Sequence, residues 1–391
     1  MRIQIGGINR KQKIYAGDGA YPLVLASVGA SDDKDSILAE VEKARLAKEY
    51  GADIIIDHTL TPKHFEVQKR ILEEVDLPLS AIAVYDMASM IKYTDKKYFT
   101  ADDVLKGIEL KAKTGVDLLT VHASVLKEDL KFFRNNDRII PCTSRGGTMV
   151  LDNILSSGEE NFYWKYFDEI LSIAKKYMLT ISLGAIFRSA DISDAVNSND
   201  MYWEELSRNA SLVKRAEQAG VSIMVEGIGH CPTNLIPEIV KKTKSICHNA
   251  PYRVLTVATD CGLGFDHVSS AIAASRAVEE GADLITAVSR SEHIGLPSAA
   301  DLVEAVTSAK IAAHCGYIAR SGDIGRDIAM SKARQEVGCR GSVEAAIVPK
   351  MTEQALKQRK QEDGKQCTMC GSFCALKRSD GIRSAGGNAH D

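Results

Sequence analysis

The 391-residue sequence lacks any apolar run that approaches the length of a membrane span. Its first residues, Met1-Arg2-Ile3-Gln4, do not begin a secretory signal peptide. It also lacks a strong charge imbalance, because 49 Lys and Arg stand against 52 Asp and Glu, for a formal net charge of −3. Since no basic field points to nucleic acid or to an anionic membrane, we expect neither as a partner.

The sequence also gives no sign of a disulfide framework or of a dinucleotide-binding motif. The cysteines number nine, an odd count in a chain without a predicted signal peptide, which argues against a disulfide framework. This predicts a cytoplasmic protein in a reducing compartment. No Gly-x-Gly-x-x-Gly motif follows the first predicted strand, Leu23–Val28, which weakens a dinucleotide-binding alternative.

What the sequence does contain is a repeated strand–helix pattern. Apolar, β-branched runs recur as continuous segments, as expected of parallel strands that are buried on both faces. An amphipathic helix is predicted at Ser36–Tyr50, between two of these runs. Eight or nine such units in about 300 residues favour a closed (β/α)8 TIM-like barrel of the α/β class over an open sheet. The predicted strands are Leu23–Val28, Ile54–Asp57, Ala81–Tyr85, Leu118–His122, Ile139–Ser144, Leu179–Leu183, Ile223–Glu226, Val254–Asp260 and Leu284–Val288.

The composition changes after the barrel. We expect residues 1–300 to form the catalytic barrel and the alanine-rich residues 301–360 to form a C-terminal helical region. Residues 361–391 begin with a charged linker and end in Gly, Ser and Asn, which predicts a flexible tail.

The tail carries a C-x2-C-x3-C cluster, made by Cys367, Cys370 and Cys374. Three thiolates can hold an iron–sulfur cubane that leaves one iron free to bind another molecule. They can equally hold a structural zinc ion that a distant His or Cys completes. The spacing alone leaves both interpretations open.

Polar and ionisable residues follow nearly every predicted strand. In a barrel these strand ends meet at one face, where active sites are built. Because a buried ionisable group costs free energy unless it is paired or coordinated, a functional ring is favoured over a set of unrelated core residues. The ring is predicted to contain Ser27, Asp57, His58, Tyr85, His122, Ser144 to Gly147, Arg188, Glu226, Asp260, Glu292 and His293.

Two parts of this ring suggest particular ligands. His230 and His293 each lie in a glycine-punctuated loop after a strand, where two imidazoles would suit zinc or a similar divalent ion. They could also be unrelated loop histidines. Ser144-Arg145-Gly146-Gly147 reads as an anion cradle or as a common surface turn, and Arg188 as a second anion ligand or a solvated side chain.

Several strings spread over nearly the whole chain resemble the thiamin pyrimidine synthase (phosphomethylpyrimidine synthase) family, in the same order and spacing. The resemblance implies a (β/α)8 barrel with a C-terminal helical region and a mobile tail that carries the cluster motif. It also implies a homodimer in which the tail reaches the active site of the partner. The strings are Val121–Ala123, Ser144–Gly147, Ser182–Gly184, Val225–His230, Cys247–Pro251, Asp266–Ile272, Glu292–Pro297, Ser331–Arg334 and Cys367–Gly371.

The resemblance further implies a radical carbon–carbon lyase. The family binds a [4Fe–4S] cluster and S-adenosylmethionine, receives electrons from a flavodoxin or ferredoxin, and rearranges 5-aminoimidazole ribonucleotide. Carried over by position, Cys367, Cys370 and Cys374 would hold the cluster, and His230 and His293 a second metal, zinc or similar. The ribonucleotide would be bound by Ser27, Tyr85, His122, Ser144, Arg145, Gly146, Arg188, Glu226 and Arg253, of which Tyr85, His122 and Glu226 would be catalytic.

The chain also departs from the family's strings. Ser27 replaces an Asn, His58 a Leu, Ala185 an Asp, Arg253 a Tyr and Ile228 a Pro. These changes remove a carboxylate and add positive charge to the predicted pocket. They favour a divergent paralog of the 5-hydroxybenzimidazole synthase type, which makes the lower base of a cobamide from the same ribonucleotide.

Three alternatives remain open. The first is phosphomethylpyrimidine synthase of thiamin biosynthesis. The second is a zinc-dependent barrel lyase with a structural zinc tail. The third is a non-catalytic chain that partners a paralogous sister subunit.

Overall fold

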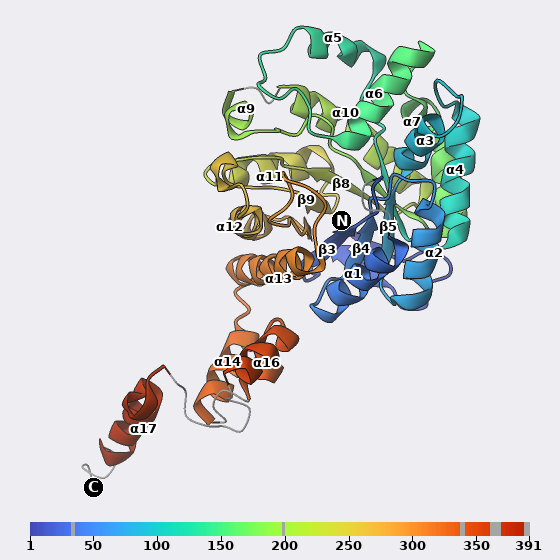
Figure 1. Cartoon of the computed structure of the whole chain (residues 1–391). Coiled ribbons are helices and arrows are strands. Elements are labelled where there is room, and N and C mark those ends of the chain that lie inside the picture. Colours follow the sequence, from blue (N-terminus) through green and yellow to red (C-terminus); the bar gives the residue numbers. More distant parts are fainter. Residues whose placement is uncertain (33–35, 198–199, 337–340, 360–368, 387–391) are drawn as a thin grey trace. The chain divides into compact units, whose positions relative to one another are not determined.

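The structure is a computed structural model that describes residues 1–32, 36–197, 200–336, 341–359 and 369–386 (Figure 1). The chain divides into two compact units, Met1–Ser321 and Gly322–Asp391. The first unit extends past the boundary expected near residue 300, because helix α13 (Ala299–Ser321) packs against α12 (Asp266–Glu279) and strand β3. Its apolar face, which includes Leu302 and Val306, is buried there.

The first unit contains a closed barrel of parallel strands in the order β10-β3-β4-β5-β6-β7-β8-β9. This confirms the predicted TIM-like fold. Strands β4, β5, β6 and β7 are buried along their whole length, as their continuous apolar sequences indicate. The strands are β3 Leu23–Val28, β4 Ile54–Asp57, β5 Leu79–Ile82, β6 Leu118–Val121, β7 Thr180–Leu183, β8 Ile223–Gly227, β9 Tyr252–Val254 and β10 Leu284–Thr286.

Helices surround this barrel and cover the outer faces of its strands (Figure 1). Helix α1 begins after Ser36, whose side chain accepts a hydrogen bond from the Ala39 amide at 3.3 Å, so the helix predicted at Ser36–Tyr50 is confirmed. The longer helices are α1 Ile37–Glu49, α2 His64–Glu74, α3 Ala83–Lys92, α4 Ala101–Thr114, α6 Arg145–Ser157, α8 Phe167–Tyr177, α10 Asp200–Ala219, α11 Ile236–Ile246, α12 and α13. Shorter turns are α5 Leu130–Arg134, α7 Phe162–Lys165, α9 Ile192–Asn197, η1 Lys127–Asp129 and η2 Asp260–Gly262.

The strand prediction was wrong in three places. Ile139–Ser144 is a connection that leads into α6, and Ile139 is 75% exposed, so its β-branched pair is not a buried strand. The prediction Ala81–Tyr85 started late and ran too far, because the strand is Leu79–Ile82 and α3 begins at Ala83. The prediction Val254–Asp260 was also late, since β9 is Tyr252–Val254.

One element was not predicted. Strands β1 (Arg2–Ile5) and β2 (Ile14–Gly17) form an antiparallel hairpin outside the barrel. Residue Gly7 in its connection donates its amide to Asp117 Oδ1 at 2.7 Å, next to the start of β6. The hairpin therefore lies at the end of the barrel where the strands begin.

The second unit is helical, in agreement with the expected C-terminal region. Helix α15 (Ser342–Ala345) packs against α14 (Gly325–Glu336) and α16 (Pro349–Gln358). Beyond residue 368 come the short turn η3 (Gly371–Phe373) and helix α17 (Ala375–Gly386).

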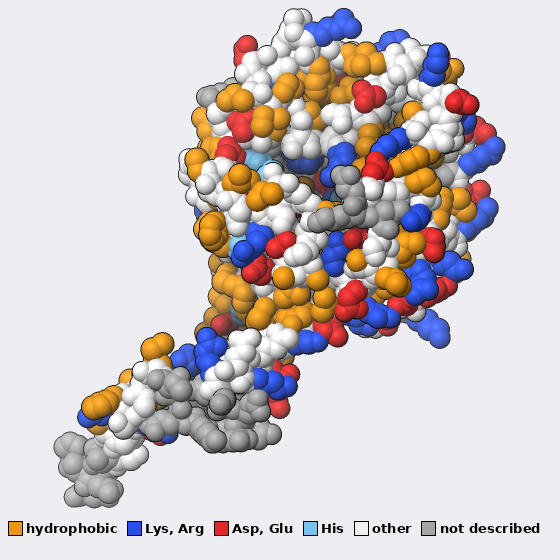
Figure 2. All heavy atoms as spheres, in the orientation of Figure 1, with side chains coloured by type: hydrophobic (Ala, Val, Ile, Leu, Met, Phe, Trp, Pro, Cys, Tyr) orange, Lys and Arg blue, Asp and Glu red, His pale blue; other side chains and the backbone are white. Residues whose placement is uncertain are grey.

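Charges of both signs are interspersed with apolar side chains on the face shown in Figure 2, in line with the near-zero net charge. None of the helices in the described ranges is long and apolar enough to cross a bilayer.

Candidate active site

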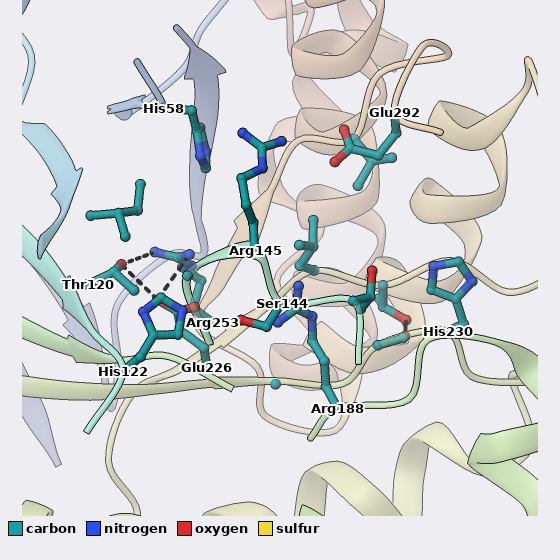
Figure 3. Close-up of a pocket in the computed structure, with 18 of the residues that line it drawn as sticks. His58, Thr120, His122, Ser144, Arg145, Arg188, Glu226, His230, Arg253 and Glu292 are labelled. Atoms are coloured by element: carbon teal, nitrogen blue, oxygen red, sulfur yellow. Dashed lines mark hydrogen bonds and ion pairs between the residues drawn. The ribbon is translucent and has the colours of Figure 1, made fainter. Parts of the chain in front are cut away.

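A cavity of about 240 Å³ opens where the barrel strands end (Figure 3). Most of the predicted site residues line this cavity, although they come from segments far apart in the chain. Ser27 does not line it, so the substrate role given to Ser27 stays a prediction. The predicted residues that line the cavity are His58, Tyr85, His122, Ser144, Arg145, Gly146, Arg188, Glu226, His230, Arg253, Glu292 and His293.

An ion pair between Glu226 on β8 and Arg253 on β9 lies in the cavity. The two residues are direct partners in the parallel register, and Arg253 Nη2 is 3.0 Å from Glu226 Oε1. The same oxygen accepts hydrogen bonds from Thr120 Oγ1 at 2.9 Å and from Ser182 Oγ at 2.7 Å. Burial lowers the pKa of Arg253, and the neighbouring Glu226 carboxylate opposes that shift.

All three of these contacts go to Oε1 of Glu226. Among the described residues, no side chain is hydrogen-bonded to Oε2. Glu226 therefore keeps one carboxylate oxygen that can accept a hydrogen bond or a proton from a ligand. Sequence reasoning missed Thr120 and Ser182, although each is a hydroxyl residue flanked by apolar residues inside a strand, which is the pattern of an inward-facing polar residue.

His122 forms a second wall, and its position is fixed by its surroundings. Asn161 Nδ2 lies 3.0 Å from the His122 carbonyl oxygen and 2.8 Å from that of Val125, which holds the loop after β6. The imidazole passes so close to Gly146 and Gly184 that a Cβ at these positions would lie 2.2 Å and 2.7 Å from ring carbons. Glycine at both positions is therefore required by the close approach of the ring.

The same imidazole is neutral near pH 7. Burial lowers the pKa of His122 to about 4, and Arg188 and Arg253 act in the same direction while Glu226 opposes them. Its Nδ1 atom is buried and has no hydrogen-bond partner among the described residues. This nitrogen is therefore an unsatisfied buried atom, and it is shielded from the open part of the cavity.

The string Ser144-Arg145-Gly146-Gly147 forms the start of helix α6. Ser144 is the N-cap, and its Oγ accepts a hydrogen bond from the Gly147 amide at 3.1 Å. The amide groups at a helix N-terminus favour a bound anion, and Arg145 and Arg188 line the same cavity. This arrangement has the donors and the charge that an anion site needs, without an acidic side chain from the helix's first turn.

Tyr85 and His58 form the third wall. Tyr85 lies in the first turn of α3, with the Arg145 guanidinium 5.9 Å from its ring centre, and burial raises the pKa of its phenol. The His58 ring, at the end of β4, lies 6.1 Å from the Tyr85 ring. Sequence reasoning placed His58 in the ring but gave it no role.

Asp57, the residue before His58, points away from this site. Its carboxylate accepts hydrogen bonds from the Thr59 amide at 3.0 Å and from Gln68 Nε2 at 2.8 Å. Burial raises its pKa, while Thr59 and Gln68 oppose the shift. Asp57 is a buried structural residue that joins β4 to α2.

His230 and His293 lie together at the edge of the cavity, with ring centres 5.0 Å apart. His230 Nδ1 is 2.6 Å from Asp260 Oδ1, and His293 Nδ1 is 3.1 Å from Asp266 Oδ1. Because a carboxylate occupies each Nδ1, both rings keep Nε2 for a ligand, the arrangement typical of metal-binding histidines.

The two imidazoles are suitable ligands for a divalent metal such as zinc, but they do not complete its coordination. In the described ranges no group of three or more His, Cys, Asp or Glu side chains is placed to hold a metal ion. The two imidazoles would therefore need water or a bound ligand at the remaining positions.

The tail cysteines are described only in part. Cys367 lies outside the described residues, whereas Cys370 and Cys374 flank the turn η3. Cys370 is exposed and Cys374 is half-buried. A backbone hydrogen bond from Lys377 lowers the pKa of the Cys374 thiol, which favours the thiolate that binds metals.

A buried carboxylate outside the cavity holds two of its loops. Glu205 on α10 accepts hydrogen bonds from the Ile186 and Phe187 amides at 2.7 Å and 2.8 Å, and from Ser124 Oγ at 3.1 Å. These groups belong to the loops after β7 and β6, which carry Arg188 and His122. The sequence signal for Glu205 was weak, since it is one of several acidic residues in a long helix.

Comparison with solved structures adds only a general likeness. A dihydropteroate synthase from Yersinia pestis aligns over 81% of this chain and 98% of its own, with 12% identity and a TM-score of 0.43. A likeness this low carries no argument about the site.

Comparison of sequences is far more specific. A phosphomethylpyrimidine synthase from Thermoanaerobacter sp. (strain X514) is 38% identical over 380 residues, covering 95% of this chain and 87% of its own. One from Dehalococcoides mccartyi (strain CBDB1) is 37% identical over 369 residues, covering 93% and 85%. The model of the radical SAM ThiC family matches residues 3–380. With the barrel and its strand-end cavity, these matches show that the chain belongs to the radical SAM ThiC family.

Proposed function

We propose that this chain is a radical S-adenosylmethionine lyase that rearranges 5-aminoimidazole ribonucleotide. The observation that carries the proposal is that one cavity is lined both by the start of helix α6 with two arginines and by the polar side chains of Tyr85, His122 and Glu226. Ser144, Arg145 and Arg188 are placed to bind the single phosphate of a mononucleotide. Tyr85, His122 and Glu226 then surround the space left for its ring.

The residues on these walls divide the chemical tasks. The Glu226 side chain is aligned by Arg253, Thr120 and Ser182, so its second oxygen can orient an N–H group or accept a proton. His122 is neutral, so its imidazole can donate or accept a hydrogen bond without adding charge. Tyr85 stays protonated because burial raises its pKa, and it can therefore donate a hydrogen bond.

The cofactors follow from the family and from the tail. Cys370 and Cys374, together with Cys367 outside the described residues, would hold a [4Fe–4S] cluster with one iron open for S-adenosylmethionine. Reductive cleavage of S-adenosylmethionine at this cluster would supply the radical that starts the rearrangement. A flavodoxin or ferredoxin would supply the electron.

His230 and His293 would hold zinc or a similar divalent ion. The paired carboxylates Asp260 and Asp266 support this assignment because they orient both rings through Nδ1. We further propose a homodimer in which the tail serves the partner's active site, as the family resemblance implies.

The comparisons favour the thiamin pyrimidine as the product, in contrast to the sequence-based ranking. The relatives that match over most of the chain are named phosphomethylpyrimidine synthases. The 5-hydroxybenzimidazole product is the second candidate. It is favoured by the Arg253–Glu226 ion pair and by the apolar Ala185, which is 1% exposed where the family pattern has a carboxylate.

The test is a product analysis under anaerobic conditions. The protein is reconstituted with iron and sulfide and given 5-aminoimidazole ribonucleotide, S-adenosylmethionine and a reductant. We expect mass spectrometry to detect hydroxymethylpyrimidine phosphate together with 5′-deoxyadenosine. A benzimidazole would instead establish the second candidate.

Two other outcomes would contradict the radical function itself. A colourless, zinc-containing protein that is active in air would be a zinc-dependent lyase. Absence of S-adenosylmethionine cleavage after full cluster reconstitution would point to a non-catalytic chain that works with a sister subunit.

A further inference from the structure

His58 lines the cavity, and the proposed function leaves it without a task. It follows Asp57 at the end of β4, and its ring lies on the wall near Arg145 (Figure 3). The side chain is partly exposed to the cavity, so it is not a core residue that packing alone would select. Neither ring nitrogen has a hydrogen-bond partner among the described residues, although the neighbouring polar groups are densely bonded to one another.

His58 is neutral over the whole working range of pH. Burial lowers its pKa to about 3, and the positive charges of Arg145 and Arg253 act in the same direction. A neutral imidazole presents one N–H donor and one acceptor nitrogen. Both are therefore open to a molecule in the cavity.

The other groups of the cavity indicate which ligand atom the acceptor nitrogen would meet. Arg145, Arg188 and Arg253 can only donate hydrogen bonds. Hydrogen-bond acceptors on the described part of the cavity include the His58 ring, Oε2 of Glu226 and the carboxylate of Glu292. A ligand amino group needs acceptors, so it must lie toward one of these groups.

We infer that His58 contacts the substrate and determines specificity by accepting a hydrogen bond from the amino group of the aminoimidazole ring. This inference rests on the proposed function, since it names the substrate group that the wall at β4 recognises. The alternative is that His58 only packs against the Tyr85 ring, 6.1 Å away. Packing alone would not distinguish between ligands that differ by one amino group.

The experiment measures binding of two ligands to the anaerobic holoenzyme by calorimetry. One is 5-aminoimidazole ribonucleotide, and the other is the same ribonucleotide without the amino group. We expect His58→Leu to weaken binding of the amino compound about tenfold, because its N–H loses an acceptor. Binding of the compound that lacks the amino group should change less than twofold.

His58→Gln is the matched variant, because its amide oxygen keeps an acceptor and it adds no charge. We expect it to recover most of the preference for the amino compound. Equal losses for both ligands, or no loss for either in His58→Leu, would overturn the inference while the proposed function stands. If the unmodified holoenzyme binds neither ribonucleotide, the proposed function and the inference both fail.

Discussion

At the scale of single residues, this site is governed by how its charges are compensated. Arg253 and Glu226 are both largely buried, and each is the other's only opposite charge within ion-pair distance in the described residues. A buried charge that loses its partner costs far more than the pair contributes. His122 and His58 avoid this cost by remaining neutral.

The ion pair leads to a first prediction. Arg253→Met should lower the free energy of unfolding by about 3 kcal/mol, because it leaves the Glu226 carboxylate buried beside only hydroxyl donors. Denaturant unfolding measures this. In the double variant Arg253→Met with Glu226→Gln, the loss should be smaller than in Arg253→Met alone, since no charge is then unpaired. A larger loss in the double variant would refute the argument.

The second prediction concerns pH and His122. Its pKa in the folded protein is lowered from 6.5 to about 4, so the unfolded chain takes up a proton first as the pH falls. Stability from this group is complete above pH 6.5 and is lost between pH 6.5 and 4, by up to about 3 kcal/mol. His122→Gln should make the unfolding free energy less dependent on pH in this window. An unchanged slope would show that His122 is solvated.

At the scale of elements, helix α10 organises the site without lining it. Glu205 on this helix holds the loops after β6 and β7. The local sequence explains where strands β6 and β7 end. Only the packing of α10 explains why Arg188 and His122, on the loops after these strands, approach one another. Strand register also positions site residues, because the parallel pairing of β8 with β9 places Glu226 beside Arg253.

Glu205 gives the third prediction. Burial raises its pKa from 4.5 to about 7, while the Ile186 and Phe187 amides oppose the shift. The folded protein therefore holds this proton more tightly than the unfolded chain, and stability falls as pH rises from 4.5 to 7. Thermal unfolding of Glu205→Gln across this range should lack that decline. The exposed neighbour Glu204 is the control, and Glu204→Gln should behave like the unmodified protein.

At the scale of the whole molecule, the proposed cofactor sites lie in separate compact units. The histidine pair belongs to the unit that ends at Ser321, and the cysteines belong to the unit that begins at Gly322. Changes in one unit should therefore leave the folding of the other intact.

This separation gives the fourth prediction. Cys370→Ser should abolish the visible absorbance of the reconstituted cluster, because two thiolates cannot replace three. Zinc content and the main thermal transition of the barrel should stay unchanged. His230→Ala is the complementary variant, with an intact cluster but less bound zinc. Loss of both metals in either variant would contradict independent sites.

Much of the fold was predictable because its signals are local. Continuous β-branched runs such as Ile54–Asp57 and glycine-ended helices are properties of neighbouring residues. The failures were local signals that tertiary packing overrode. Ile139 and Ile140 look like a strand but lie exposed in the connection before α6, and Tyr85 looks like a strand end but sits on a helix.

The sequence by itself determined the barrel and the ring of polar residues after its strands, since each depends on residues close together in the chain. Only the tertiary structure decided which members of the ring meet. Barrel closure brings Thr120, Ser182 and Arg253 to one oxygen of Glu226, turns Asp57 away and leaves His58 facing the cavity. These contacts join distant segments, and their geometry depends on strand register and helix packing, which no local pattern contains.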